Sequence, residues 1–288
     1  MAKPLTVKEF FIRFPDDDTC LEHVMDLRYG RTRNCPKCGQ KTEFYRLSKR
    51  PAYSCKLCGH HIYPCAGTPF ERTRTPLQSW FYAIYLFTTT RHGVPAKELQ
   101  RQLGVTYKCA WRMGHEIRKF IGEIDGDDGL SGHVELDETY VGGKRTDIAE
   151  GQSFKVDKTP VFGMVQRGGE IITRVVPDNK AATLLPIVEQ YVAKGTVLST
   201  DQWLAYRGLR KLGYQHDSVN HRIRQWAKGD THTNTIEGFW SNFKNSVRGT
   251  HKSISPKHMQ KYLREFEFRF NLRGPQAPLM FDRLIQGF

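Results

Sequence analysis

Three acidic residues stand at positions from which a folded chain can bring their carboxylates together. Asp137 lies in a segment of alternating apolar and polar residues, Asp201 follows directly after a short buried strand, and Glu237 lies in the first turn of a predicted helix. They are separated by 63 and 35 intervening residues. Such a cluster repels itself unless cations fill it, and hard divalent ions with oxygen ligands, typically Mg²⁺, are the natural occupants. Two such ions about 4 Å apart can activate an attacking oxygen and stabilise a leaving one.

Each of the three residues also has a purely structural interpretation. Asp137 fits a solvated strand residue, and Asp201 fits a cap of the helix that follows it. Glu237 comes three residues after Asn234, a spacing that resembles a capping box, in which the glutamate satisfies a backbone amide at the helix end. Because two strand sites and a helix are involved together, we favour one shared metal site over three unrelated local roles.

The helix that carries the glutamate has a polar face that turns basic. At helical spacing this face repeats Glu237, Ser241, Lys244 and Arg248, whereas the adjacent apolar face holds Ile236, Trp240, Phe243 and Val247. A DNA backbone that enters the metal site can follow the polar face, so Lys244 and Arg248 are candidate phosphate contacts. The alternative is an amphipathic helix whose polar face is merely solvated.

Four cysteines form two CxxCG knuckles with 16 residues between the pairs: Cys35, Cys38, Cys55 and Cys58. The glycine after each pair permits the positive φ that such a tight turn usually needs. Four sulfurs at this spacing match tetrahedral zinc in a ribbon, a closed site that folds a small module and is not catalytic. The alternatives are four free thiols, or a ligand from His60 or His61. The cysteines without paired spacing are expected as buried thiols: Cys20, Cys65 and Cys109.

A helix, a glycine and a second helix over residues 95–120 predict a helix-turn-helix. The second helix is expected from about 107 to 120 and is basic, with Lys108, Arg112, Arg118 and Lys119. As a recognition helix it would enter the major groove of DNA, and Lys108 and Arg112 are the candidate contacts. The alternative is an ordinary helical pair that links the ribbon to the core.

Composition and net charge indicate the general class of protein. The 288 residues allow two domains or one core with appended modules, and 39% hydrophobic with 26% charged residues is typical of a globular chain. The net charge of +14 is uneven, with +8 in residues 31–75 and +9 in residues 207–264. Concentrated positive charge suits a polyanion such as nucleic acid, although a solvated basic surface is the alternative. The longest apolar run, 80–87, is too short to span a membrane, and the N-terminal stretch has no signal-peptide core. We therefore expect an intracellular protein without a membrane partner.

The elements that must position the acidic residues form a mixed sheet with flanking helices. An acidic, Gly-rich break at 122–132 separates them from a helical N-terminal part, in which Pro15 divides two amphipathic helices over 5–28. The core candidates of these two helices are Val7, Phe10, Phe11, Phe14, Leu21, Val24, Met25 and Leu27. Beyond the break, three strands come first, the second and third joined by a two-residue turn at Gly168-Gly169. Helix, strand, helix, strand and further helices then follow, over 181–193, 196–200, 203–212, 214–219, 234–248 and 256–271. Because a helical crossover normally joins parallel strands, the sheet should contain both parallel and antiparallel pairs. The polar loop 142–158 suggests a mobile or functional insertion.

Three stretches are similar to the DDE transposases and retroviral-type integrases: 136–144 (LDETYVGGK), 200–203 (TDQW) with Tyr206, and 232–240 (HTNTIEGFW). They contain Asp137, Asp201 and Glu237, and Lys244, seven residues after the glutamate, matches a basic residue that many insertion-sequence transposases carry there. The chain resembles one branch in particular, the bacterial insertion-sequence transposases with an N-terminal zinc ribbon, which are related to the eukaryotic Merlin elements. The resemblance covers roughly residues 5–272.

The resemblance implies a ribonuclease H-like catalytic core and a transposase activity. Such an enzyme binds the terminal inverted repeats of its element, cuts at each end and joins the exposed 3′ hydroxyl to target DNA. The acidic triad would hold two Mg²⁺ or Mn²⁺ ions, the four cysteines one structural Zn²⁺, and Lys244 would position a phosphate. The implied partners are double-stranded DNA, at transposon ends and target, and at least one further copy of the chain, because two ends are paired. We expect a bacterial cytoplasmic protein that is nucleoid-associated when bound to DNA.

The predicted fold class is α+β, mixed: a zinc ribbon and a helix-turn-helix, then a ribonuclease H-like sheet with flanking helices. The predicted parts are a helical segment at 1–30, the ribbon at 31–72, the helix-turn-helix region at 76–121, the catalytic domain at 132–272 and a C-terminal tail at 273–288. A ribonuclease H-like nuclease without strand transfer is the alternative within the enzymes. A domesticated zinc-ribbon regulator that only binds DNA is the alternative outside them, and the intact acidic triad argues against it.

Overall fold

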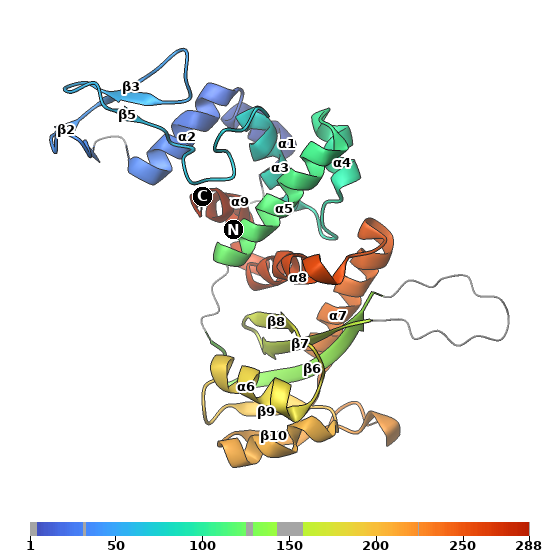
Figure 1. Cartoon of the computed structure of the whole chain (residues 1–288). Helices are drawn as coiled ribbons and strands as arrows, with labels where there is room; N and C mark the ends of the chain where they lie inside the picture. Colours follow the sequence, from blue (N-terminus) through green and yellow to red (C-terminus); the bar gives the residue numbers. More distant parts are fainter. Residues whose placement is uncertain (1–4, 31–32, 125–128, 143–157, 224, 288) are drawn as a thin grey trace. The chain divides into compact units, whose positions relative to one another are not determined.

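A computed structural model describes residues 5–30, 33–124, 129–142, 158–223 and 225–287 (Figure 1). The chain forms two compact units, which we describe separately. The N-terminal unit comprises Met1–Thr90, Val94–Phe120 and Gly274–Phe288, and the sheet unit comprises Arg91–Gly93 and Ile121–Arg273. The predicted insertion at 142–158 lies outside the described residues except for its two ends. Within the described ranges, none of the helices combines the length and hydropathy that a membrane span requires.

The N-terminal unit begins with the two predicted helices, α1 (Val7–Arg13) and α2 (Asp17–Tyr29). Pro15 lies between them, and Asp16 caps α2 by accepting a hydrogen bond from the backbone N–H of Thr19 at 2.8 Å. Most of the predicted core is confirmed as buried: Phe10, Phe14, Leu21, Val24 and Met25. The prediction is wrong for Val7, Phe11 and Leu27, which are exposed.

The cysteine-rich segment forms two small antiparallel sheets, β1 (Arg33–Asn34) with β2 (Lys41–Thr42), and β3 (Phe44–Arg46) with β4 (Tyr53–Cys55) and β5 (His61–Ile62). Helices α3 (Leu77–Thr89), α4 (Ala96–Leu103) and α5 (Tyr107–Ile124) follow. Gly104 ends α4 in the left-handed conformation, with φ of 65°, as a helix-turn-helix corner requires. The second helix of this pair is therefore confirmed, and it runs four residues further than predicted.

The C-terminal residues differ from the predicted tail. They form a 3₁₀ helix, η4 (Gly274–Leu279), and helix α9 (Met280–Gln286). The ring of Phe281 is buried and lies 5.6 Å from Phe14 and 6.4 Å from Phe81, measured between ring centroids. Helix α9 is thus part of the core of the N-terminal unit, because its apolar side chains fill the space between α2 and α3.

The sheet unit is built on five strands in the order β10 (Gln215–Ser218), β9 (Val197–Thr200), β6 (His133–Val141), β7 (Thr159–Gln166) and β8 (Ile171–Val175). Strands β6, β7 and β8 are antiparallel neighbours, whereas β9 is parallel to β6 and β10 is parallel to β9. The predicted mixed sheet is confirmed, and its order and directions are those of a ribonuclease H-like core.

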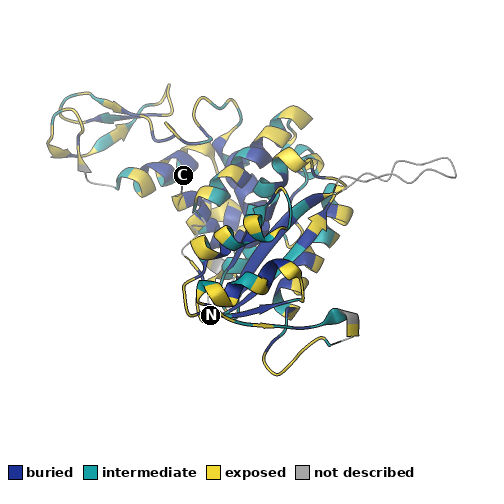
Figure 2. Ribbon diagram, turned by 60° about the horizontal axis from the view of Figure 1, so that its bottom comes forward, coloured by how far each residue is buried: buried dark blue, intermediate teal, exposed yellow. Residues whose placement is uncertain are grey.

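Helices cover both faces of this sheet, whose strands are largely buried (Figure 2). On one face, α6 (Ala181–Tyr191) and the 3₁₀ helix η1 (Leu204–Leu212) pack on a core that includes Leu136, Phe162 and Leu198. On the other, α7 (Asn234–Ser246) and α8 (Pro256–Asn271) pack on a core that includes Val161 and Val165. Each such fully buried side chain contributes about 1.5–3 kcal/mol of transfer free energy.

Three local details differ from the sequence expectations. The segment 204–212 winds as a 3₁₀ helix rather than an α-helix, and a short 3₁₀ turn, η2 (His221–Ile223), follows β10. Helix α7 ends at Ser246 and continues as a π-helical turn, η3 (Val247–His251). The β7–β8 turn contains Arg167, Gly168 and Gly169, because the N–H of Gln166 donates to the carbonyl of Glu170 at 2.8 Å and Gly168 supplies the positive φ of 71°.

Candidate active site

Asp137 lies in the middle of β6, paired with Gly163 on β7. Val134 and Leu136 point into the core under α6, and Glu135 contacts α7, so the predicted alternation of apolar and polar residues along this strand is confirmed. Asp137 shares the side of Glu135 because side chains along a strand alternate. The strand therefore presents its aspartate to the face that α7 covers.

The other two carboxylates come from neighbouring elements. The pairing of β6 with β9 ends at Glu135 and Ser199, so Asp137 and Asp201 each lie two residues further along their parallel strands. Glu237 lies in the first turn of α7, which packs on both β6 and β7. The parallel register explains why two residues 64 positions apart in sequence lie side by side, just beyond the last β6–β9 pair.

The electrostatics of Asp137 indicate that these carboxylates are close. Burial raises the pKa of Asp137, and the nearby carboxylates of Glu138, Asp201 and Glu237 raise it further, to about 8. The nearby ammonium is that of Lys244, whose pKa burial lowers while the charge of Asp137 raises it. The carboxyl groups that raise the pKa of Asp137 thus come from Glu138, Asp201 and Glu237, and this donor set of hard oxygens fits a divalent cation.

The three carboxylates do not form a closed ligand set as they stand. A carboxylate oxygen of Asp201 accepts the backbone N–H of Trp203 at 2.9 Å, and Glu237, with 45% of its side chain exposed, accepts the hydroxyl of Thr233 at 2.7 Å. Among the residues that the structure describes, the four ribbon cysteines are the only His, Cys, Asp or Glu group whose ligand atoms lie within 4.8 Å of one another. The proposed box with Asn234 is absent from this helix start, because Thr233 occupies the cap position and its hydroxyl binds Glu237 directly.

Glu138 is held on the opposite face of β6. Its carboxylate accepts the hydroxyl of buried Tyr206 at 2.6 Å. Burial raises the pKa of Glu138 to about 7, and the charge of Asp201 adds to the rise, while the Tyr206 hydrogen bond opposes it. Tyr206, which the resemblance singled out without a role, is therefore the partner of a second carboxylate beside the site.

Glu135 anchors the start of α7. Its side chain is completely buried, and its carboxylate accepts the backbone N–H groups of Thr235 at 2.8 Å and Ile236 at 3.1 Å, together with the Thr235 hydroxyl at 2.9 Å. The first N–H groups of a helix lack partners within the helix, and a carboxylate there also suits the helix dipole. Glu135 therefore ties the helix of Glu237 to the strand of Asp137.

Arg167 completes this anchor. Its guanidinium donates to Glu135 at 2.8 Å and to the carbonyls of Asp230 at 2.6 Å and His232 at 3.1 Å, so it holds the segment that leads into α7. A ring nitrogen of His232 lies 3.1 Å from the same carboxylate. Sequence reasoning missed this role, and the signal that pointed to it was an arginine directly before a Gly-Gly turn opposite an acidic strand residue.

Gly163 allows α7 to approach the sheet beside Asp137. A Cβ atom at this position would lie 2.5 Å from the Trp240 ring and 2.8 Å from Ile236, both on α7. These distances are shorter than van der Waals contact, so a larger residue would force the helix away. The glycine was also missed, because its requirement arises from a helix more than 70 residues away in sequence.

Replacing Glu135 by alanine is expected to destabilise the sheet unit by about 3–5 kcal/mol, because the half-buried Arg167 guanidinium and two helix N–H groups lose their partner. Denaturant unfolding followed by circular dichroism measures this loss. Glu189→Ala is the matched control, since this exposed glutamate on α6 pairs only with exposed Lys194 and its loss should cost less than about 1 kcal/mol. Equal stability of the two variants would contradict the anchoring role.

The four cysteines converge as predicted. Their sulfur atoms all lie within 4.8 Å of one another, with Cys35 and Cys55 buried and Cys38 and Cys58 half-buried. Burial alone would raise the pKa of Cys55, but backbone N–H groups of the knuckle donate to its sulfur and lower the pKa. Gly39 and Gly59 have φ of 70° and 72°, which the two tight turns require. This geometry fits one tetrahedral zinc ion.

The remaining cysteines have no such arrangement. Cys20 and Cys65 are buried, and burial raises the pKa of their thiols to about 12 and about 11. Cys109 is only half-buried and its sulfur lies 3.3 Å from the Thr75 hydroxyl, so the expectation of a buried thiol is wrong there.

The basic residues of α5 have different environments. Lys108 is exposed, and the Arg112 guanidinium lies 5.4 Å from the centre of the Trp80 ring. Arg118 is 3% exposed, donates to the carbonyl of Val94 at 2.9 Å and lies over the Phe87 ring. Arg118 is therefore a core residue and does not contribute to the basic surface that the sequence suggested.

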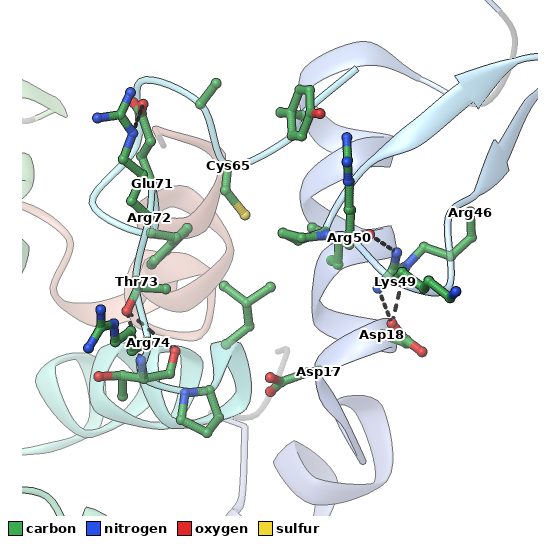
Figure 3. Close-up of a pocket in the computed structure, with 18 of the residues that line it drawn as sticks. Asp17, Asp18, Arg46, Lys49, Arg50, Cys65, Glu71, Arg72, Thr73 and Arg74 are labelled. Atoms are coloured by element: carbon green, nitrogen blue, oxygen red, sulfur yellow. Dashed lines mark hydrogen bonds and ion pairs between the residues drawn. The ribbon is translucent and has the colours of Figure 1, made fainter. Parts of the chain in front are cut away.

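A cavity of about 770 Å³ in the N-terminal unit collects further basic side chains (Figure 3). Lys49 and Arg50, from the loop between β3 and β4, lie across it from Arg72 and Arg74, which precede α3. Arg46 is instead paired with Asp18 at 2.7 Å. The cavity also has apolar lining residues, including Leu21, Phe70 and Leu77. Sequence reasoning counted these charges but did not assign them to one place.

The fold and the site define a class: a zinc-ribbon protein with a ribonuclease H-like sheet, on which Asp137 is buried near three further carboxylates. Comparisons with known proteins agree. The ISXO2-like transposase domain matches residues 129–271 and the transposase zinc-ribbon domain matches residues 15–61. The chain belongs to this family of zinc-ribbon insertion-sequence transposases, and it is a transposase with a DDE-type domain.

Relatives support the same assignment. A protein in transposable element ISH50 of Halobacterium salinarum is 28% identical over 280 residues, which cover 88% of this chain and 92% of the relative. A transposase-like protein of Haemophilus influenzae is 32% identical over 102 residues, covering 35% of this chain and 81% of the relative. The pre-cleavage Mos1 transpososome contains a chain with 14% identity and a TM-score of 0.29, with 67% of this chain and 74% of that chain covered. A TM-score this low does not establish a shared fold.

Proposed function

We propose that this transposase binds the terminal inverted repeats of its element, cleaves one DNA strand at each end and joins the resulting 3′ hydroxyl to target DNA. The observation that carries the proposal is the position of Asp137, whose pKa is raised to about 8 by burial and by the carboxylates of Glu138, Asp201 and Glu237. Carboxylates that repel one another in this way suit a site that holds divalent ions for phosphoryl transfer.

Two reactions at phosphorus follow one another in this proposal. Water attacks the scissile phosphorus, the bond to the 3′ oxygen breaks, and a 3′ hydroxyl and a 5′ phosphate result. The 3′ oxygen then attacks a phosphorus of the target, loses its proton, and displaces the target's own 3′ oxygen. Because one phosphodiester bond forms as another breaks, the second reaction needs no energy source and no covalent link to the protein.

The side chains of the sheet unit have distinct parts in these reactions. Asp137, Asp201 and Glu237 would hold the divalent ions, Mg²⁺ or Mn²⁺, which supply activation of the attacking oxygen and stabilisation of the leaving one. Lys244, half-buried and electrostatically coupled to Asp137, would bind a non-bridging oxygen of the reacting phosphate. Glu135 and Arg167 keep α7 against β6, so Glu237 and Lys244 stay in place relative to Asp137.

Binding of the element's ends is assigned to the N-terminal unit. Lys108 and Arg112 on α5, and Lys49, Arg50, Arg72 and Arg74 around the cavity of Figure 3, are its candidate DNA contacts. Phosphate contacts of this kind release counterions, so binding should weaken steeply with salt. Two ends must be paired for transposition, so the active form would be a dimer or a higher oligomer on DNA.

Arg112→Ala is expected to weaken binding to an element end more than binding to random duplex, by about tenfold against about twofold, because base reading adds to the phosphate contribution. Electrophoretic mobility shifts with both probes measure this difference. Arg112→Lys is the control, since lysine restores a phosphate contact but not the planar fork that reads a base. Equal losses on both probes would assign Arg112 to phosphate contact or to packing on Trp80.

The test of the proposed function is a strand-transfer assay with purified full-length protein. The substrate is a labelled duplex that carries the end of the element and its flank, and a supercoiled plasmid serves as the target. Cleaved ends and labelled joined plasmid are expected with Mg²⁺ or Mn²⁺. Cut ends without joined product would identify a nuclease instead, and binding without cleavage would identify a regulator.

A further inference from the structure

A second cavity, of about 810 Å³, lies in the sheet unit at the C-terminal end of α7. The end of β6, the start of β7, the π-helical turn and the segment 252–256 line it. Four of its lining residues are cationic: Lys158, Lys244, Arg248 and Lys252. Among the described residues that line it, none is acidic. A hollow with charge of one sign focuses the field and attracts an anion.

The four cations are without ion-pair partners among the residues that the structure describes. Burial lowers the pKa of Lys244, and the charges of Arg248 and Lys158 lower it further, against the opposing effect of Asp137. Arg248 and Lys158 thus repel Lys244 across the cavity. Mutual repulsion costs stability in the free protein, and a bound polyanion would relieve it.

The backbone around the cavity is irregular. Helix α7 widens into the π-helical turn Val247–His251, and Lys252 then takes φ of 64°, a conformation that side chains with a Cβ rarely adopt. Such outliers cost roughly 1–3 kcal/mol and concentrate at ligand sites, as π-helical turns also do. Lys252 thus lines the cavity together with Arg248 of the π-helical turn and Lys244 of α7.

The position of the cavity relative to Asp137 follows from β6. Tyr140, Val141 and Gly142 line it and lie three to five residues beyond Asp137 on the same strand and its continuation. At a rise of about 3.3 Å per residue this is roughly 10–16 Å. Phosphates of one strand of a duplex are about 3.4 Å apart along the axis, so this distance corresponds to roughly three to five nucleotides.

We infer that this cavity is a second phosphate site, which binds the DNA backbone three to five nucleotides from the scissile phosphate. The inference rests on the proposed function, because that function places the scissile phosphate at Asp137. The backbone could belong to the element or to its flank, and both offer the same phosphodiester anions. Lys244, which lines the cavity and is coupled to Asp137, lies where the two phosphate sites meet.

The first test combines Lys158→Ala with Lys252→Gly in the full chain. The probe is a duplex from the DNA that flanks the gene, and its Kd is measured by fluorescence anisotropy from 50 to 200 mM salt. We expect roughly tenfold weaker binding and a salt slope lower by about two, because two phosphate contacts are lost. Lys211→Ala is the matched control, an exposed lysine on η1 outside the cavity, and it should keep the wild-type slope.

Thermal unfolding separates a binding role from a structural one. Lys252→Gly relieves the positive φ, so its melting temperature should equal or exceed that of the wild type while its DNA binding weakens. A binding loss that accompanies a lower melting temperature would overturn the inference. So would a double variant with wild-type affinity and slope.

Neutral methylphosphonates locate the phosphates. One is placed at each position up to six nucleotides from the mapped cleavage site, on the element side or on the flank side. At three to five nucleotides on one side it should weaken binding by the wild type but have no further effect on the double variant. Equal effects on both proteins at every position would overturn the inference.

A wild-type protein that neither cleaves nor joins would contradict the proposed function, whereas an active wild type with an unchanged slope in the double variant contradicts this inference alone.

Discussion

Asp137→Asn is expected to leave a folded protein that binds DNA ends but has lost cleavage and strand transfer by at least about 10³-fold, which corresponds to about 4 kcal/mol of activation free energy. Asparagine keeps the size of the side chain and loses the anionic ligand that the metal requires. Asp201→Asn should behave in the same way, because both residues lie two positions beyond the last β6–β9 pair. Single-turnover cleavage with Mg²⁺ and with Mn²⁺ measures the loss.

Stability provides the control for this prediction. Since the folded pKa of Asp137 is raised from 3.8 to about 8, the metal-free folded protein holds more protons than the unfolded chain between these pH values. Its stability therefore falls as pH rises from about 4 to about 8. Asp137→Asn removes the contribution of Asp137 to this dependence and leaves that of Glu138, whose pKa is also raised, so the metal-free variant should be at least as stable as the wild type at pH 8. An inactive variant that is also less stable would point to a structural role for Asp137.

The variant Glu237→Gln tests whether Glu237 is a metal ligand or only a residue that caps α7. Glutamine can still accept the hydroxyl of Thr233, so a residue that only orders the helix start would leave activity nearly intact. A metal ligand would not, and activity should collapse while metal-free stability changes little. Full activity of Glu237→Gln would show that Glu237 is not a metal ligand. The next carboxylate to test would then be Glu138, which lies on the other face of β6 and whose pKa the charge of Asp201 raises.

The sequence predicted the site best where a short local pattern, such as strand alternation or helical spacing, determines which way a side chain points. Alternation along 134–141 placed Asp137 on one face of β6, and helical spacing placed Glu237 and Lys244 on the polar face of α7. The cysteine knuckles were equally readable, because each tight turn carries both its ligands and its glycine. In these cases every residue that determines the geometry lies within a few positions of the functional one.

The supporting residues could not be predicted in this way. Glu135 reads as a second solvated acid until α7, 100 residues later, places two N–H groups over it. Arg118 reads as a surface cation until the fold buries it against Phe87 and the carbonyl of Val94. The burial of Phe281 depends likewise on helices at the other end of the chain. Such roles depend on contacts between residues that are far apart in the chain, and a single sequence does not show which distant residues come into contact.

Cys55→Ser is expected to remove zinc from the protein and to unfold the ribbon while the sheet unit stays folded. Apparent binding free energies of structural zinc are about 10–16 kcal/mol, whereas the short strands β1 to β5 offer little buried apolar surface of their own. A serine leaves three sulfurs and a poor fourth ligand. Metal analysis should give one zinc per chain in the wild type and substantially less in the variant.

Matched variants make this prediction specific to the ribbon. Cys109→Ser changes a cysteine on α5, outside the knuckles, and should keep both zinc and DNA binding. In Cys55→Ser, binding to the element's end should fall by at least about tenfold, because the loop that carries Lys49 and Arg50 joins the ribbon strands β3 and β4. The sheet unit draws its stability from its two buried cores, which contain no ribbon residue, so its thermal transition should be unchanged. Reduced, chelator-free wild-type protein without zinc would show that the four thiols hold the ribbon together by packing alone.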